Sequence, residues 1–248
     1  MNEDFEILRF TDTPHLQTLA VQAIQAGWSR FWTEDPVSRP LWPEIVQCFL
    51  PYHFGIVEKA TGRLAAVGLT VPLAWDGADV ELLEHGWHWV LKHSLADYHA
   101  GRTPHTLSAV NAVVLPEFRG YGLAEPLVRE MQATAKKWGL SRFIAPLRPT
   151  QKHRYPLMDI ADYMNWRNPD GSPFDAWLRL QTRLGAEIIG PARRSIVITA
   201  PLSDWSEWTG LEFPYPGDYI VPDAAVPLRV ENGVGTLVSP SIWIVARP

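Results

Sequence analysis

The first residues of the chain change from a strand-like to a helix-like spacing of apolar side chains. Residues 5–10 place apolar and polar or charged side chains in turn, which is typical of an edge strand. From Leu16 to Gly27, apolar residues recur every three or four positions, so we expect an amphipathic helix. Asp12 or Thr13 is expected to cap its first turn, because both side chains accept hydrogen bonds from backbone N–H groups.

The same periodicity predicts further strands and helices up to residue 145. The predicted strands cover residues 53–58, 64–73, 107–115 and 142–145, and the predicted helices cover residues 44–50 and 123–138. Gly62 lies between the first two of these strands, which predicts a hairpin. The longer helix places apolar side chains on one face, at Leu123, Leu127, Met131, Ala135 and Trp138. Gly139 is expected to end it.

The last part of the pattern is less regular. Three stretches lie outside this regular order, and they cover residues 75–103, 148–173 and 201–248. The pattern predicts an α/β (α+β) fold, with a domain over residues 1–200. Residues 201–248 are expected to form a β-rich extension packed on the same domain.

Composition limits the class of protein. With 248 residues and 46% hydrophobic content, the chain can bury a full core. Its single cysteine, Cys48, excludes an internal disulfide framework and a cysteine-based metal site. No apolar run approaches 18 residues and the first residues are acidic, so we expect a cytoplasmic protein without a membrane partner.

The charge is unevenly distributed along the chain. The net charge is −5, yet residues 129–194 carry 12 Lys and Arg against 6 Asp and Glu, a local excess of +6. A basic middle suits a polyanionic ligand or partner. The alternative is that these side chains only solvate helix faces.

One segment carries the strongest chemical signal. The strand over 107–115 leads into a turn that contains Gly120 and Gly122, and the turn leads directly into the helix over 123–138. Glycines let the main chain approach a ligand closely. The unpaired N–H groups at a helix start, together with the helix dipole, favour an anion. The segment therefore predicts a phosphate-binding cradle.

The cradle resembles the acyl-CoA pyrophosphate loop of the GNAT superfamily of N-acetyltransferases, whose pattern is Gln/Arg-x-x-Gly-x-Gly/Ala. Arg119, Gly122 and Ala124 occupy its defined positions. Residues 174–187 resemble the last GNAT helix and its turn, with Gln181 where the family commonly has a tyrosine and Ala186 in place of a phenylalanine. The resemblance implies two closing strands after it, over 187–189 and 195–199. The resemblance implies a mixed, mostly antiparallel sheet flanked by helices and splayed between its fourth and fifth strands.

The resemblance also implies roles for individual residues. Acetyl-CoA or another acyl-CoA would be the co-substrate, with its diphosphate on Arg119, Gly120, Tyr121, Gly122, Leu123 and Ala124. Main-chain groups of Val113 and Val114 would hold the pantetheine arm, and a strand N–H, taken as that of Val114, would polarise the thioester carbonyl. One such donor contributes about 3 to 4 kcal/mol to catalysis.

A general base is harder to identify. The fourth strand offers Ser108 and Asn111 as polar candidates. The loop candidates are Asp159, Asp162, His153 and Tyr155, each of which is more readily explained as structural. Because the family's tyrosine is absent, Gln181 is the remaining candidate for hydrogen bonding to the leaving thiolate. His85 and His88 lie one turn apart, but without a third ligand of matching spacing we expect no metal.

These observations leave three hypotheses. The first is an N-acyltransferase that moves an acyl group, by preference acetyl, from acyl-CoA to an amine of a small molecule. The second keeps the fold but uses an acyl carrier protein or an aminoacyl-tRNA as donor, because of the basic segment over 129–194. The third is a binding module that holds acyl-CoA without turnover. The sequence leaves a monomer and a homodimer both open.

Overall fold

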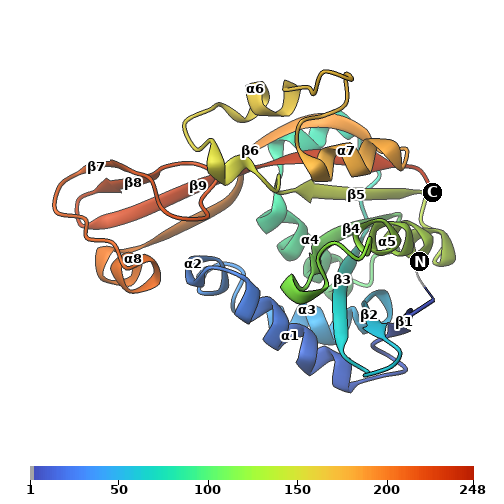
Figure 1. Cartoon of the computed structure of the whole chain (residues 1–248). Coiled ribbons are helices and arrows are strands. Elements are labelled where there is room, and N and C mark those ends of the chain that lie inside the picture. The colour runs from blue at the N-terminus through green and yellow to red at the C-terminus, as the bar shows by residue number, and fades with distance from the viewer. Residues whose placement is uncertain (1–2) are drawn as a thin grey trace.

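The computed structural model describes residues 3–248. Within that range one nine-stranded sheet runs in the order β1-β2-β3-β4-β5-β9-β8-β7, and β6 pairs with β9 outside this path. The strands are β1 (Phe5–Arg9), β2 (Phe54–Glu58), β3 (Leu64–Leu73), β4 (Thr106–Val114), β5 (Arg142–Leu147), β6 (Glu187–Pro201), β7 (Gly217–Tyr219), β8 (Leu228–Glu231) and β9 (Val234–Ala246). All neighbours are antiparallel except β4 and β5, which are parallel. The mixed, mostly antiparallel sheet is confirmed (Figure 1).

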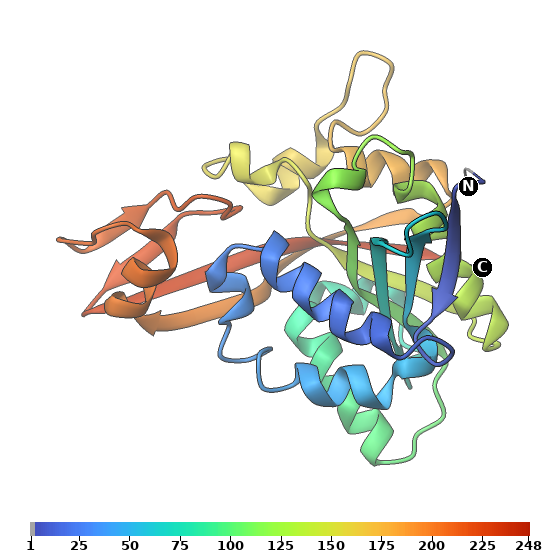
Figure 2. The same ribbon diagram turned by 60° about the horizontal axis from the view of Figure 1, so that its bottom comes forward.

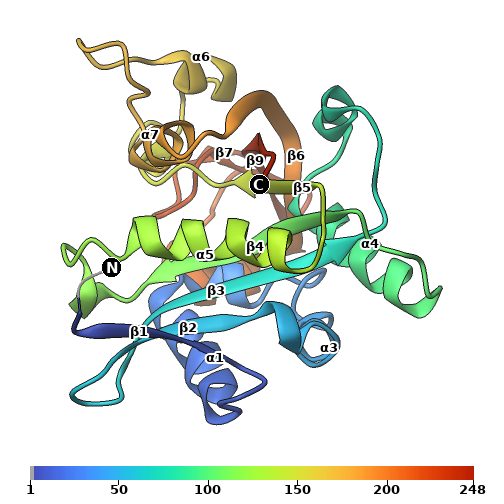
Figure 3. The ribbon, with the colours of Figure 1, turned by 90° about the vertical axis from the view of Figure 1, so that its right-hand side faces the viewer.

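Helices cover both faces of this sheet. They are α1 (His15–Gly27), α2 (Arg30–Thr33), α3 (Trp42–Cys48), α4 (Trp87–His99), α5 (Ala124–Lys137), α6 (Ile160–Asn165), α7 (Ala176–Arg183) and α8 (Leu202–Thr209). Short 3-10 turns are η1 (Leu50–Tyr52), η2 (Asp79–Glu84), η3 (Pro116–Phe118) and η4 (Lys152–Arg154). Figures 2 and 3 show α1 and α3 on one face of β1–β4 and α5 on the other. All ten residues of β3 are buried, as expected for a strand covered on both faces.

The C-terminal strand is part of the central sheet. β9 pairs with β5 over Phe143–Leu147 and with β6 along most of its length. The far halves of β6 and β9 extend away from the rest of the sheet and carry α8, β7 and β8 as a lobe (Figure 1). The sheet is therefore not complete at residue 200, because β9, from the C-terminal part of the chain, pairs with both β5 and β6.

Three local expectations are wrong. The two closing strands are one strand, β6, because irregularities between Ile188 and Gly190 and between Ala192 and Ile196 let it continue through the expected turn. Neither Asp12 nor Thr13 caps α1, whose N-cap is Pro14 without a side-chain hydrogen bond. Their backbone N–H groups instead bond to the Arg9 carbonyl.

The third concerns Trp138, expected on the buried face of α5. It is the C-cap of that helix, 44% exposed, and its ring packs 4.8 Å from that of Tyr52. The remaining apolar positions of the predicted face, from Leu123 to Ala135, are buried as expected.

The segment over 148–173 is ordered by two buried polar groups. Asp175, at the start of α7, accepts hydrogen bonds from the Tyr163 hydroxyl at 2.9 Å and from Thr150 Oγ1 at 3.1 Å. Burial, followed by the Asp175 charge, raises the pKa of Tyr163, so it remains a donor. The fully buried Lys152 donates through Nζ to the carbonyls of Tyr155 and Ala225, which ties this segment to the C-terminal lobe.

Candidate acyl-CoA site

The cradle is open and its glycines are required by the backbone. Gly120 has φ +89° and Gly122 has φ +75°, in the left-handed region that L-residues rarely adopt. A Cβ built on either glycine meets no heavy atom within 4 Å. The space above this turn is therefore free for a ligand.

The cradle also presents unused donors. Among residues 3–248, the amide N–H groups of Gly122, Leu123 and Ala124 have no intramolecular acceptor, whereas Tyr121 N–H bonds to Phe118 and Arg119 N–H to Pro116. Three adjacent N–H groups at the start of a 14-residue helix form a site that favours an anion. The predicted phosphate cradle fits this geometry.

β4 and β5 splay apart along the part of β4 that leads to the cradle. The two strands pair only from Thr106–Arg142 to Ser108–Ile144, and β4 then continues alone on that side as far as Val114. A register irregularity between Leu69 and Thr70 of β3 leaves Val110 of β4 without a partner residue. The Val110 carbonyl accepts instead from Trp87 Nε1 at 2.8 Å.

The β3 ladder decides which main-chain groups of β4 face the splay. Leu115 N–H donates to Ala65, and antiparallel pairs alternate, so Val113 is also bonded to its partner Val67 on β3. Ala112 and Val114 then direct their N–H and C=O groups toward β5. The main chain of Val113 faces β3 instead, and the binding roles expected for Val113 and Val114 stay predictions.

The three polar candidates, Ser108, Asn111 and Gln181, are all buried in the core. Ser108 is fully buried and its Oγ makes a long 3.3 Å contact with the Ala109 carbonyl. Asn111 and Gln181 are 5% and 4% exposed, and in the described chain neither Asn111 Oδ1 nor Gln181 Oε1 has a hydrogen-bond partner. Buried unpaired acceptors are uncommon, so these two atoms remain available to a ligand donor.

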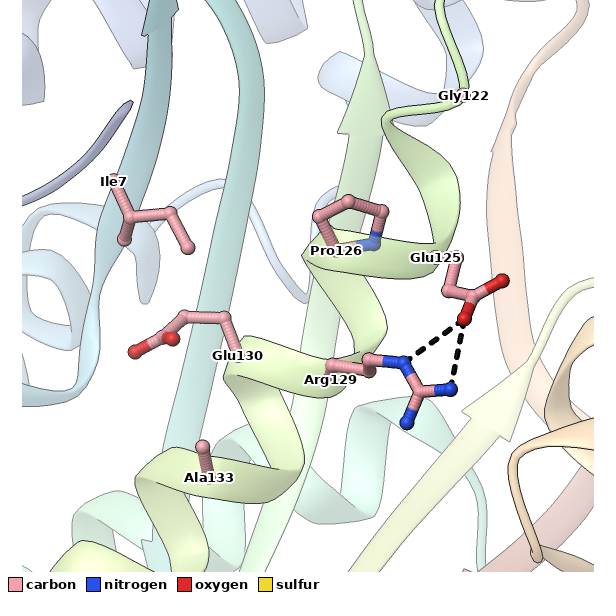
Figure 4. A pocket seen from close by; sticks show the side chains of 7 residues that line it. All are labelled: Ile7, Gly122, Glu125, Pro126, Arg129, Glu130 and Ala133. Carbon is pink, nitrogen blue, oxygen red and sulfur yellow. Dashed lines mark hydrogen bonds and ion pairs between the residues drawn. The ribbon is translucent and has the colours of Figure 1, made fainter. Parts of the chain in front are cut away.

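Ion pairs surround the outer side of the cradle helix. Glu125 accepts from Arg129 on the same helix and from Arg183 of α7, each at 2.7–2.9 Å. The hydrogen bond from Arg129 and the two positive charges hold the pKa of Glu125 below its usual value. Glu125 also lines a surface hollow of about 520 Å³ that runs along α5 from Gly122 to Ala133. Figure 4 shows the side chains that line it. Two cations are thus held close to the cradle.

The loop candidates for a base have structural roles or lie on the surface. Asp159 caps α6 through Ala161 N–H and pairs with Arg193 at 2.7 Å. Tyr155 packs in an aromatic cluster, 5.0 Å from Trp166. Asp162 and His153 are exposed.

His88 on α4 and His85, directly after η2, take part in separate interactions. His88 Nε2 lies 2.6 Å from Asp35 Oδ2, and its Nδ1 accepts from Val197 N–H at 3.4 Å. Burial is the largest single influence on Asp35 and would raise its pKa, but the hydrogen bonds from His88, Ser38 and Val37 N–H and the attraction of His88 together outweigh it, so the pKa is lowered. His85 instead stacks on Trp89 at 4.3 Å. Among residues 3–248, no group of three potential ligands could hold a metal ion.

Sequence reasoning missed one cluster. Arg148 directly follows β5, and its guanidinium lies between Trp28 and Trp32, with centroid distances of 4.6 and 4.5 Å. The two tryptophans come from the start of the chain, on either side of the α1–α2 junction. A cation at the end of a buried strand was the only available signal, and its partners are more than a hundred residues away.

Comparison with known proteins finds chains that are similar in sequence or in fold. No family model matches the chain. An arginine N-acetyltransferase of Aspergillus versicolor, avaD, is 28% identical over 246 residues, covering 88% of this chain and 84% of the relative. The crystal structure of the loading GNATL domain of CurA from Lyngbya majuscula matches with a TM-score of 0.60 at 13% identity, covering 98% of this chain and 97% of that one. In fold and in sequence, the chain therefore resembles the GNAT superfamily of N-acetyltransferases.

Proposed function

We propose that the protein is an N-acetyltransferase that transfers an acetyl group from acetyl-CoA to an amine of a small molecule. The observation that carries the proposal is the open cradle at Gly120–Ala124, with its unpaired N–H groups, at the end of a strand whose neighbour has parted from it. The sequence relative acts on arginine according to its name, which supports an amine acceptor.

The residues around the splay have distinct roles in this proposal. The diphosphate of the co-substrate is held by the N–H groups of Gly122, Leu123 and Ala124, with Arg119 beside them. When bound, acetyl-CoA supplies the activated acyl group. The main chain of Ala112 and Val114 binds the extended arm, and a β4 N–H stabilises the developing oxyanion; such a donor contributes about 3 to 4 kcal/mol.

The acceptor amine must lose a proton, since alkylammonium pKa values lie near 10. We propose that Ser108 and Asn111 orient the amine by hydrogen bonding, because Asn111 Oδ1 is a buried acceptor without a partner, and that the proton itself passes to solvent water, since neither side chain is basic enough to hold it. Gln181 is assigned to the leaving thiolate through its side-chain N–H. A primary amide is a weak acid, so its contribution is a hydrogen bond and not proton transfer.

We also propose that residues 1–200 and 201–248 fold as one unit, because β9 lies between β5 and β6. Among the described helices, none is both long and apolar enough to cross a bilayer.

The function is tested in two steps. Calorimetric titration with CoA should show binding that is lost in Gly122→Glu, where a carboxylate occupies the anion site. Release of free CoA from acetyl-CoA should then depend on an added amine. Absence of CoA binding by the intact chain would overturn the proposal, and binding without transfer to any amine would favour an acyl-CoA-binding module.

A further inference from the structure

Arg148 occupies an aromatic corner built by two distant tryptophans. Its guanidinium carbon lies 4.6 Å from the Trp28 ring centre and 4.5 Å from that of Trp32. The two rings are nearly perpendicular, at 86° and 6.5 Å apart. A planar cation held against two ring faces has a fixed orientation, and such contacts are stronger when water is excluded.

Two hydrogen-bond donors in this corner have nothing to bind. Arg148 Nη1 and Trp32 Nε1 are both fully buried, and neither has a hydrogen-bond partner among residues 3–248. The indole nitrogen can only donate, and so can the guanidinium. A buried donor without an acceptor costs about 1 to 3 kcal/mol of stability. Two such donors in one corner point to an acceptor that a ligand supplies.

The charge of Arg148 is also uncompensated at close range. Within the described chain, no carboxylate lies within 4 Å of it. Asp223 attracts it from farther away, but that exposed carboxylate accepts from Ser29 Oγ at 2.6 Å. Burial lowers the pKa of Arg148 to about 10, which leaves the guanidinium charged at neutral pH. Arg148 Nη1 and Trp32 Nε1 therefore form a positively charged corner with two unused donors.

The corner lies beside the splay but away from the cradle helix. Arg148 is the first residue after β5, the strand that separates from β4 beyond Ser108. Trp28 and Trp32 flank the junction of α1 and α2, and α1 covers the face of β1–β4 opposite to α5 (Figures 2 and 3).

We propose that Arg148 and Trp32 bind a carboxylate of the acceptor, so that the acceptor is an amino acid and not a simple amine. This inference rests on the acetyltransferase function proposed above. Arg148 supplies a planar fork that matches the two oxygens of a carboxylate, and Trp32 Nε1 supplies a further donor. Trp28 keeps the guanidinium plane in place.

Matched substrate pairs test the proposal. Each pair is an amino acid and the amine formed by its decarboxylation, such as arginine and agmatine, lysine and cadaverine, tyrosine and tyramine, and histidine and histamine. The two members keep the same reacting amine and differ in the carboxylate. Initial rates are measured with acetyl-CoA for the intact chain, Arg148→Gln, Trp32→Phe and Arg154→Gln, the last being an exposed arginine of the same segment.

The preferred pair should show at least a tenfold higher kcat/KM for the amino acid. Arg148→Gln should lower that value by about 10- to 100-fold through KM, while the paired amine is nearly unaffected. Trp32→Phe keeps an aromatic ring but removes the indole N–H donor, and it should lower kcat/KM for the amino acid by a smaller factor. Arg154→Gln should match the intact chain. Thermal unfolding identifies any variant whose loss comes from misfolding, and Trp32→Phe then carries the test.

Four outcomes overturn the inference. Equal rates within every pair, or a preference that survives in Arg148→Gln, would leave an acetyltransferase without this carboxylate site. Preference for succinyl-CoA over acetyl-CoA that disappears in Arg148→Gln would assign the carboxylate to the acyl donor. No CoA binding and no acetylation of any amine would overturn the proposed function itself, and this inference with it.

Discussion

Gly122→Ala separates the role of the cradle in binding from its role in folding. Gly122 has φ +75°, and its matched control is Gly139, with φ +66° at the other end of the same helix. A Cβ meets no heavy atom within 4 Å at either position, so neither substitution causes a clash within the chain. Both alanines must instead adopt a left-handed backbone, which costs about 1 to 2 kcal/mol.

The two variants should therefore lose similar stability. A loss of about 1 kcal/mol lowers Tm by roughly 2 to 4 °C for a chain of this size. Only the methyl group of Gly122→Ala enters the space that the cradle leaves for an anion. Loss of one N–H bond to a charged oxygen is worth about 1.5 to 3 kcal/mol, which corresponds to roughly a 10- to 150-fold increase in Kd.

Thermal unfolding and calorimetric titration with CoA measure the two effects on the same samples. The expected result is a similar fall in Tm for both variants, with weaker CoA binding in Gly122→Ala alone. If Gly122→Ala binds CoA as tightly as Gly139→Ala does, the turn is a structural feature of the strand-to-helix junction and the cradle argument fails.

Three further predictions concern the fold. Burial lowers the pKa of His53 to about 3, below its unfolded value near 6.5. As the pH falls, the unfolded state therefore takes up the proton first, and about 2 kcal/mol of stability should be lost between pH 6.5 and 4.5. Denaturant titrations should show that this dependence of stability on pH is weaker in His53→Leu and unchanged in the exposed-site control His105→Leu. Lys152→Met leaves two buried carbonyls without their donor and should lower the free energy of urea unfolding by about 2 kcal/mol, a result contradicted by an unchanged midpoint. Deletion of residues 201–248 removes the strand between β5 and β6 and should abolish cooperative thermal unfolding; a truncated chain that melts cooperatively would show that the sheet can close without β9.

Local patterns predicted most of the first 145 residues. The strands β2 and β3, the helix α5 and the glycines of the cradle each follow from residues close together in the chain, because periodicity and left-handed turns are decided by near neighbours. The cradle could be located for the same reason, since a strand, a turn and a helix start lie within a dozen residues.

The tertiary structure decided what depends on distant contacts. No local signal shows that Val234–Ala246 fills the sheet between β5 and β6, because strand order is set by which apolar faces find each other. The same holds for Arg148, whose surroundings come from Trp28 and Trp32 at the opposite end of the fold. Residues 119–124 predict an anion site from the sequence alone, since the donors of that site are neighbours in the chain. Only the packing of distant segments decided which groups face that position across the splay, because the burial and electrostatic environment of a residue depend on its contacts with many others.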